Sequence, residues 1–184
     1  GHDWTVALWE VSTPSVPLHV FEGHDRDVLA VSFEPTRGLI ASGSADRTVR
    51  LWEAKSLSHT RTYPRAKNFI TAIAFSPDGG TVLIGTLSGR ISLYSTNDRR
   101  RMRRFRGHTG RITSLTFIGG GREFVSASAD GTVRLWNRRV SRARQTFGSA
   151  GSKISNAAVS PDGRMIATGK DNGTVQIWNG VVLD

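Results

Sequence analysis

Hydrophobic positions along this 184-residue chain gather in short stretches of four to six residues, separated by polar turns. Residues 28–33, 39–42 and 48–52 are typical, because each is rich in the β-branched, aliphatic or aromatic side chains that favour a β-strand. Turn sequences stand between such stretches, as in Pro-Asp-Gly at 77–79 and Asp-Gly at 130–131. No stretch shows the 3.6-residue periodicity of an amphipathic helix. The pattern predicts an all-β protein built of antiparallel hairpins.

The same strand pattern returns every 42 residues, and no gap is needed from Phe21 to Trp178 when the chain is aligned on itself with this shift. Three columns of the alignment read Phe21, Tyr63, Phe105 and Phe147; Phe33, Phe75, Phe117 and Val159; and Trp52, Tyr94, Trp136 and Trp178. Aromatic columns that stay in step without an insertion indicate a tandem array of one structural unit. Each unit contains four short strand segments.

Two repeats begin with a Gly-His pair and end with a tryptophan, at Gly23-His24 to Trp52 and at Gly107-His108 to Trp136. In both, the histidine and the tryptophan are 28 residues apart. With these motifs on four-stranded repeats, the sequence resembles the WD-repeat (WD40) family over essentially the whole chain. The resemblance implies an all-β fold, a β-propeller built of four-stranded antiparallel blades.

The number of repeats falls short of a ring. Residues 3–9 match residues 46–52, so the chain opens inside a repeat. We expect the end of a first repeat at 1–17, WD repeats at 18–52, 60–94, 102–136 and 144–178, and a tail at 179–184 in which residues 181–183 begin a further outer strand. About four and a half repeats form an incomplete ring, because propellers close with roughly 4–8 blades and this family favours the larger rings. We therefore expect a fragment of a larger propeller, or a chain that completes its ring with another chain.

The resemblance also implies a hydrogen-bonded tetrad within one blade, made of His24, Ser42, Asp46 and Trp52. The indole N–H of the tryptophan donates to the serine, the serine bonds the histidine, and the aspartate accepts from the histidine. A Ser-His-Asp set also invites interpretation as a catalytic triad. However, a nucleophile site would not be duplicated in register 84 residues later. We therefore interpret the set as structural.

The other repeats keep the tetrad to different degrees. The full set returns at His108, Ser126, Asp130 and Trp136. The fourth repeat keeps Thr168 and Trp178 but has Ala150 and Asn172 at the other two places. The second repeat has lost the set and carries Ala66, Ile84, Ser88 and Tyr94.

Motifs for other chemistry are missing from the sequence. There is no phosphate-binding loop and no HExxH motif, and the five histidines do not cluster at metal-ligand spacing. Cysteine is absent, which excludes disulfides and cysteine-based zinc sites. No apolar run approaches the ~18–20 residues of a membrane span. We expect no catalytic residue, cofactor, metal, small-molecule substrate or membrane contact, and an intracellular (cytoplasmic or nuclear) protein.

The formal net charge of +10 is unevenly distributed. Residues 1–53 hold eight acids against four bases, whereas residues 99–144 hold thirteen arginines against two acids. The candidate basic belt comprises Arg99, Arg100, Arg101, Arg103, Arg104, Arg106, Arg138, Arg139, Arg142 and Arg144, with Lys55, Arg61 and Arg65 at similar places one blade earlier. These positions lie on or beside the outermost strands of neighbouring blades. The belt either binds an acidic partner or only protects those strands from edge pairing.

By resemblance, partners bind mostly on the narrow top face of a propeller, on the loops that enter the first strand and beside the second hairpin. The candidate residues there are Arg26, Asp27, Asn68, Phe69, Leu87, Arg111, Lys153, Lys170 and Asp171. An exposed Phe69 or Leu87 would be a candidate anchor, since aromatic side chains dominate interface hot spots. The alternative for Phe69 is that its ring packs under its own loop.

The sequence therefore favours a non-enzymatic scaffold that mediates protein–protein interactions within a larger intracellular assembly, as a subunit of a complex. The alternative is a ribonucleoprotein component whose arginine belt binds RNA phosphate or another acidic surface. No aromatic residues are interleaved with the arginines to stack on bases, which disfavours sequence-specific reading of RNA. Fold alone does not decide between these functions.

Overall fold

A computed structural model describes residues 2–12, 15–149 and 151–179. The further strand expected at 181–183 and the tetrad position Ala150 lie outside the described residues. Within them the chain forms antiparallel β-sheets and a single short 3-10 turn, Gly119–Gly121, at the place of the Pro-Asp-Gly turns of other repeats. The predicted all-β fold is confirmed.

The described strands form five sheets. The first sheet has two strands, β1 (Val6–Leu8) and β2 (His19–Phe21). Three four-stranded sheets follow: β3 (Val28–Phe33), β4 (Leu39–Ser44), β5 (Val49–Glu53) and β6 (Ser58–Thr62); β7 (Ile70–Phe75), β8 (Thr81–Thr86), β9 (Ile91–Ser95) and β10 (Arg101–Phe105); and β11 (Ile112–Ile118), β12 (Glu123–Ser128), β13 (Val133–Asn137) and β14 (Ala143–Phe147). The last sheet has three strands, β15 (Ile154–Val159), β16 (Met165–Lys170) and β17 (Val175–Asn179).

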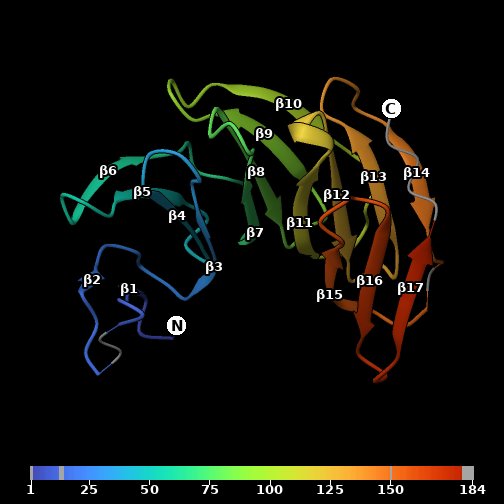
Figure 1. Cartoon of the computed structure of the whole chain (residues 1–184), viewed down its shortest axis with the longest axis horizontal. Helices are drawn as coiled ribbons and strands as arrows, with labels where there is room; N and C mark the ends of the chain where they lie inside the picture. The colour runs from blue at the N-terminus through green and yellow to red at the C-terminus, as the bar shows by residue number, and fades with distance from the viewer. Residues whose placement is uncertain (1, 13–14, 150, 180–184) are drawn as a thin grey trace.

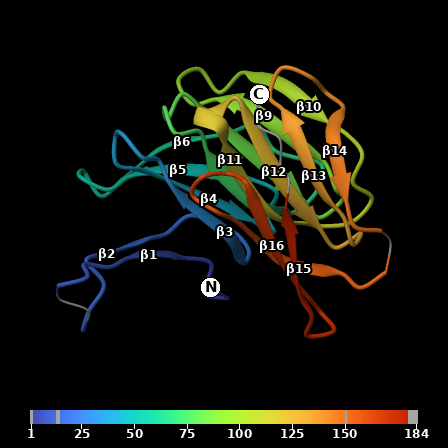
Figure 2. The ribbon, with the colours of Figure 1, turned by 45° about the vertical axis from the view of Figure 1, so that its right-hand side comes forward.

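The sheets stand side by side in an arc, as the blades of a propeller do (Figures 1 and 2). Strand order within each sheet follows the chain, and the first strands β3, β7, β11 and β15 contact one another in sequence. Outer strands such as β10 and β14 lie at the periphery (Figure 1). The arc does not close into a ring, in agreement with the expected incomplete set of blades.

Repeated local features give each blade its shape. The pairing of every first strand with its second shifts register at the same place, for example between Val28 and Ala30 and between Ile70 and Ala72. Such a β-bulge increases the twist that a blade needs. Neighbouring blades then approach closely where the second strand has a glycine: a Cβ at Gly85 would lie 2.7 Å from Cγ2 of Ile112 on the next blade.

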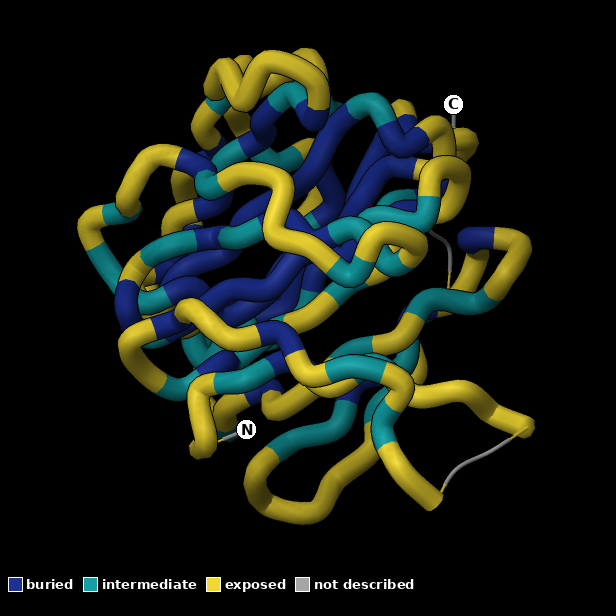
Figure 3. The backbone as a smooth tube through the Cα atoms, turned by 90° about the vertical axis from the view of Figure 1, so that its left-hand side faces the viewer, coloured by how far each residue is buried: buried dark blue, intermediate teal, exposed yellow. Residues whose placement is uncertain are grey.

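Burial follows the position of a sheet in the arc. Strands β7 and β8 are buried along their whole length, because sheets cover both of their faces. Figure 3 shows buried segments side by side in the middle of the molecule and exposed segments around them. Strands near the two ends of the arc carry exposed apolar side chains instead: Val31 and Phe33 on β3 are 60% and 62% exposed, and Val175 and Ile177 on β17 are 71% and 57% exposed. In the described ranges only the two-stranded sheet of β1 and β2 precedes the sheet of β3, against which it lies, and no sheet follows β17.

Candidate protein-interaction site

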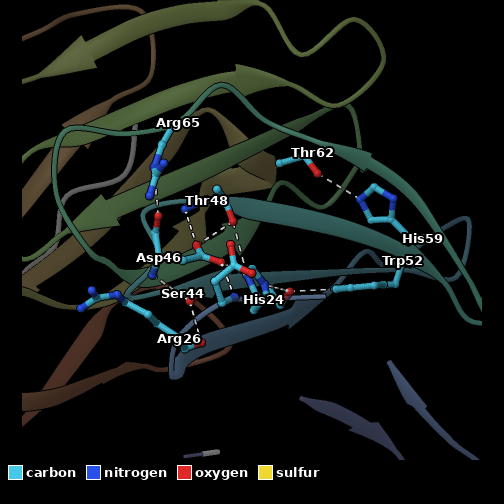
Figure 4. A network of polar contacts seen from close by, with 11 residues as sticks. His24, Arg26, Ser44, Asp46, Thr48, Trp52, His59, Thr62 and Arg65 are labelled. Atoms are coloured by element: carbon cyan, nitrogen blue, oxygen red, sulfur yellow. Dashed lines mark hydrogen bonds and ion pairs between the residues drawn. The ribbon is translucent and has the colours of Figure 1, made fainter. Parts of the chain in front are cut away.

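His24, Ser42, Asp46 and Trp52 meet inside the blade formed by β3–β6 (Figure 4). The indole Nε1 of Trp52 donates to Ser42 Oγ at 2.8 Å, and Ser42 Oγ lies 2.7 Å from His24 Nε2. His24 Nδ1 lies 2.7 Å from Asp46 Oδ2. We name this set the His24 tetrad. All four residues are buried, and Ser42 is 0% exposed.

The electrostatics of the His24 tetrad favour a neutral imidazole and an ionised carboxylate. Desolvation lowers the pKa of His24 despite its bond to Asp46. Burial alone would raise the pKa of Asp46, but hydrogen bonds from Thr48 and His24 outweigh it and lower the pKa to about 2. The serine hydroxyl therefore donates to His24 Nε2, and Nδ1–H donates to the carboxylate. Each buried polar group has a partner, as the low-dielectric interior requires.

The His108 tetrad has the same geometry in the blade formed by β11–β14. Trp136 Nε1 to Ser126 Oγ is 2.8 Å, His108 Nε2 to Ser126 Oγ is 2.7 Å, and His108 Nδ1 to Asp130 Oδ2 is 2.8 Å. Desolvation lowers the pKa of His108, and hydrogen bonds outweigh burial to bring the pKa of Asp130 to about 2. Ser126 is 0% exposed.

The two remaining repeats use other contacts at these places. In the fourth repeat Trp178 Nε1 donates to Thr168 Oγ1 at 3.2 Å, and Asn172 Nδ2 donates to Ser152 Oγ at 3.0 Å. In the second repeat Tyr94 is buried against the ring of Tyr63, with the centroids 5.5 Å apart. Apolar packing replaces the polar network in that blade.

The first tetrad also fixes the loops at the adjoining end of the blade. Ser44 Oγ donates to the carbonyl oxygen of Arg26 at 2.9 Å and accepts from Asp46 N–H at 2.9 Å. Arg65 Nε donates to the carbonyl oxygen of Asp46 at 3.2 Å (Figure 4). The turn that carries the tetrad carboxylate therefore holds the loop that enters β3 and the loop that leads to β7.

Equivalent backbone hydrogen bonds join the two loops at this end of every blade. Ala45 N–H donates to Asp27, Leu87 to Phe69, Ala129 to Arg111 and Asp171 to Lys153, over 2.8–3.0 Å. Two of these bonds join two candidate residues, Leu87 to Phe69 and Asp171 to Lys153, and the other two join a candidate, Asp27 or Arg111, to an alanine. We call this surface the top face.

Only part of the candidate set lines a hollow. Arg26, Asn68 and Phe69 line a hollow of about 270 Å³, and Asp27 lines a neighbouring one of about 510 Å³. Phe69 is half-buried and contributes to both walls. Leu87 is 41% exposed outside them. The remaining candidates Arg111, Lys153, Lys170 and Asp171 lie on the top face but line neither hollow.

Sequence reasoning missed two cations that line the smaller hollow, Arg47 and Lys67. The sequence places a third cation, Arg65, with the belt one blade earlier, whereas in the structure Arg65 lies beyond the end of β6 and lines this hollow. The signal lay in the alignment columns, because Arg47 stands where the other three repeats have glycine.

Only some arginines of the basic belt are exposed and available to bind a partner. Arg100, Arg101, Arg104 and Arg106 are exposed on or beside β10, and Arg100 also lies 3.8 Å from the carboxylate of Asp98. Other members are held within the protein: Arg99 Nη1 donates to the carbonyl oxygen of Thr62, Arg103 Nη1 donates to Ser141 Oγ, and Arg144 Nη1 pairs with the buried Glu123 at 2.8 Å. Arg142 and Arg139 are exposed beside β14, and Arg138 is half-buried. The exposed positive charge is therefore concentrated on β10.

Four segments of the chain match the family described as WD domain, G-beta repeat: residues 15–53, 57–95, 99–137 and 142–179. These segments cover most of the sequence. The chain belongs to the WD-repeat family. The predicted resemblance is confirmed, and the blades are WD blades.

Relatives match over short segments. The chain is 50% identical to protein Mut11 of Chlamydomonas reinhardtii over 44 residues, 24% of this chain and 12% of that protein. It is 40% identical to the human peroxisomal targeting signal 2 receptor over 53 residues, 28% of this chain and 16% of that receptor. It is 37% identical to the target of rapamycin complex subunit wat1 of Schizosaccharomyces pombe over 59 residues, 32% of this chain and 19% of that subunit. The matches thus span less than a fifth of these relatives.

The described part of the chain offers few other sites. Across residues 2–12, 15–149 and 151–179, no three or more His, Cys, Asp or Glu side chains gather as metal ligands would. The same residues contain no helix with the length and apolar character of a membrane span.

Proposed function

We propose that this WD-repeat chain is a non-enzymatic scaffold that binds other proteins through its top face, as a subunit of a larger assembly. The observation that carries the proposal is the paired-loop architecture: in each blade a backbone hydrogen bond locks the loop that enters the first strand to the turn after the second. Rigid loops on a packed scaffold are a common setting for recognition. Relatives named as a targeting-signal receptor and as a complex subunit support the same class of function.

Burial of the two serines supports a non-catalytic role. Ser42 and Ser126 are 0% exposed, and each hydroxyl already accepts an indole N–H and donates to a histidine. A nucleophile must reach both its base and a substrate carbon. Neither serine reaches a surface from which substrate could approach, so the Ser-His-Asp geometry stabilises the blade.

Affinity capture with top-face variants tests the scaffold function. We expect the chain to retain protein partners after nuclease treatment, and the double variant Leu87→Asp, Arg111→Asp to lose them. Both positions are exposed, so the variant should fold. The matched control is Arg101→Asp, Arg104→Asp on β10, which we expect to keep the same partners. Partners that survive the top-face change but not the β10 change would overturn the proposal.

The exposed arginines on β10 favour RNA phosphate as a second candidate ligand. Each phosphate of a single strand that the protein neutralises adds about 0.7 to the magnitude of the slope of log affinity against log salt. Changing Arg100, Arg101, Arg104 and Arg106 to serine should therefore flatten this slope by about 3 in fluorescence anisotropy with a generic single-stranded RNA. Absence of binding at low salt, or an unchanged slope, would remove RNA as a ligand.

A further inference from the structure

Four cations surround the smaller hollow of the top face, which has a volume of about 270 Å³. They are Arg26, Arg47, Arg65 and Lys67, and no carboxylate lines this hollow. Within the described ranges none of the four forms an ion pair, although the chain carries acids nearby at Asp25 and Asp27. We call this the basic hollow. All four side chains are exposed, so they are free to bind an anion that enters the hollow, and such an anion would offset the repulsion between them.

Arg47 has a backbone conformation that an arginine side chain disfavours. Arg47 has φ 74°, in the left-handed region. The same turn position is glycine in the other three repeats, with φ 75° at Gly89, 85° at Gly131 and 82° at Gly173. A side chain in this conformation is disfavoured relative to glycine, and strained residues of this kind cluster at functional sites.

Arg65 and Lys67 also differ from the residues in the same columns of other repeats. Arg65 stands where the first and third repeats have Gly23 and Gly107. Its Nε donates to the carbonyl oxygen of Asp46, which fixes the guanidinium beside the turn while its two terminal nitrogens have no hydrogen bond within the described residues (Figure 4). Lys67 stands where the first repeat has Asp25, a reversal of charge. Substitutions in three columns therefore converge on one hollow.

A second hollow, of about 510 Å³, shares Arg26, Ala45 and Phe69 with the basic hollow and adds Trp4, Asp25 and Asp27. Trp4 is 49% exposed and Phe69 half-buried, so this hollow presents aromatic surface together with acidic side chains. It suits an apolar or basic side chain. The shared wall lets one extended segment reach both hollows.

We propose that the two hollows bind a segment of a partner protein in which a phosphorylated side chain enters the basic hollow and the adjacent apolar or basic residue lies against Trp4 and Phe69. A phosphate carries a charge of roughly −1.5 to −2 at pH 7 and three acceptor oxygens, which match several guanidinium groups. A single carboxylate would neutralise only one of the four cations. Asp25 and Asp27 would repel the next phosphate of a nucleic acid, which favours a phosphoprotein over RNA. This inference rests on the proposed scaffold function.

Binding of short fluorescent peptides to the full chain tests the inference. The probe is a degenerate library around a fixed phosphothreonine or phosphoserine, compared with the same library unphosphorylated and with aspartate at the fixed position. We expect the phosphorylated library to bind at least tenfold more tightly than either control library. Equal binding of the three libraries, or binding by none of them, would overturn the inference. Tightest binding by the aspartate library would also overturn it, in favour of a carboxylate ligand.

Substitutions taken from the other repeats keep the test independent of folding. Arg47→Gly and Lys67→Asp each insert the residue found in the same column of another repeat, so both variants should fold. We expect each to weaken phosphopeptide binding about tenfold or more, whereas Arg104→Ser on β10 leaves it unchanged. Phosphopeptide binding that is unaffected by either change would overturn the assignment to the basic hollow.

Protein capture separates failure of this inference from failure of the scaffold proposal. If partners are retained after phosphatase treatment and by the Arg47→Gly variant, the scaffold function stands and the phosphate inference falls. If no partner survives nuclease treatment, the scaffold function itself falls.

Discussion

Removing the imidazole of His108 tests how much a tetrad stabilises its blade. The ring is buried and bridges Ser126 Oγ at 2.7 Å and Asp130 Oδ2 at 2.8 Å. His108→Leu fills most of the same volume without any polar atom, so it removes the hydrogen bonds and keeps much of the packing against Trp136.

The expected cost comes mainly from the serine. Ser126 is 0% exposed, and without the imidazole its hydroxyl proton has no acceptor. Asp130 is less affected, because Oδ2 still accepts from Thr109 N–H at 3.0 Å and Oδ1 from Thr132 Oγ1 at 2.7 Å. A buried donor left unsatisfied costs about 1–3 kcal/mol. We therefore expect His108→Leu to lower the free energy of unfolding by about 1–3 kcal/mol, and His108→Ala by more, because it also leaves a cavity.

Urea unfolding followed by tryptophan fluorescence measures this cost, and a double-mutant cycle assigns it. The cycle combines His108→Leu with Ser126→Ala, and we expect the double variant to cost less than the sum of the two single changes, because no serine hydroxyl then remains to be orphaned. The matched control is Ser88→Ala, an exposed residue in the column of Asp130, with an effect within about 0.5 kcal/mol. Our reasoning would be refuted by a His108→Leu variant as stable as the control, or by additive costs.

Three further results are expected. Stability should fall as pH drops below about 6.5, because histidines in the unfolded chain bind protons more readily than the two tetrad histidines, whose pKa values are lowered. Stability should fall again from about pH 4 towards pH 2, as the tetrad carboxylates, with pKa values of about 2, become protonated. Thermal melting at several pH values would contradict this if stability were flat or increased towards acid. The isolated chain should self-associate in light scattering through the exposed apolar side chains of β3 and β17, and Phe33→Ser should increase the monomer fraction. A wild-type chain that is monomeric at high concentration would disprove this. Arg47→Gly should stabilise the chain by about 0.5–1 kcal/mol in urea unfolding by relieving the positive φ, and a loss of stability would show that the arginine supports the turn.

The strands, the turns and the repeat could all be predicted from the sequence. These features are local, since strand composition, Pro-Asp-Gly turns and a 42-residue period can be read without knowing what lies beside them. The resemblance also named the residues of the two tetrads, because their atoms belong to one blade and recur at one spacing. The structure brings them within hydrogen-bonding distance.

Which arginines are free of ion pairs, and which residues line the same hollow, could be seen only from the packing of the strands and blades. Arg144 looks like its neighbours in the sequence, yet it is paired with the buried Glu123 on another strand of its sheet. Arg26 and Lys67 lie in successive repeats, and they line one hollow only because the blades pack closely, with glycines such as Gly43 and Gly85 admitting the isoleucines of the next blade. Periodicity fixes the faces of a strand but not the distance and angle between two sheets, because these depend on how the side chains of one sheet fit against the other.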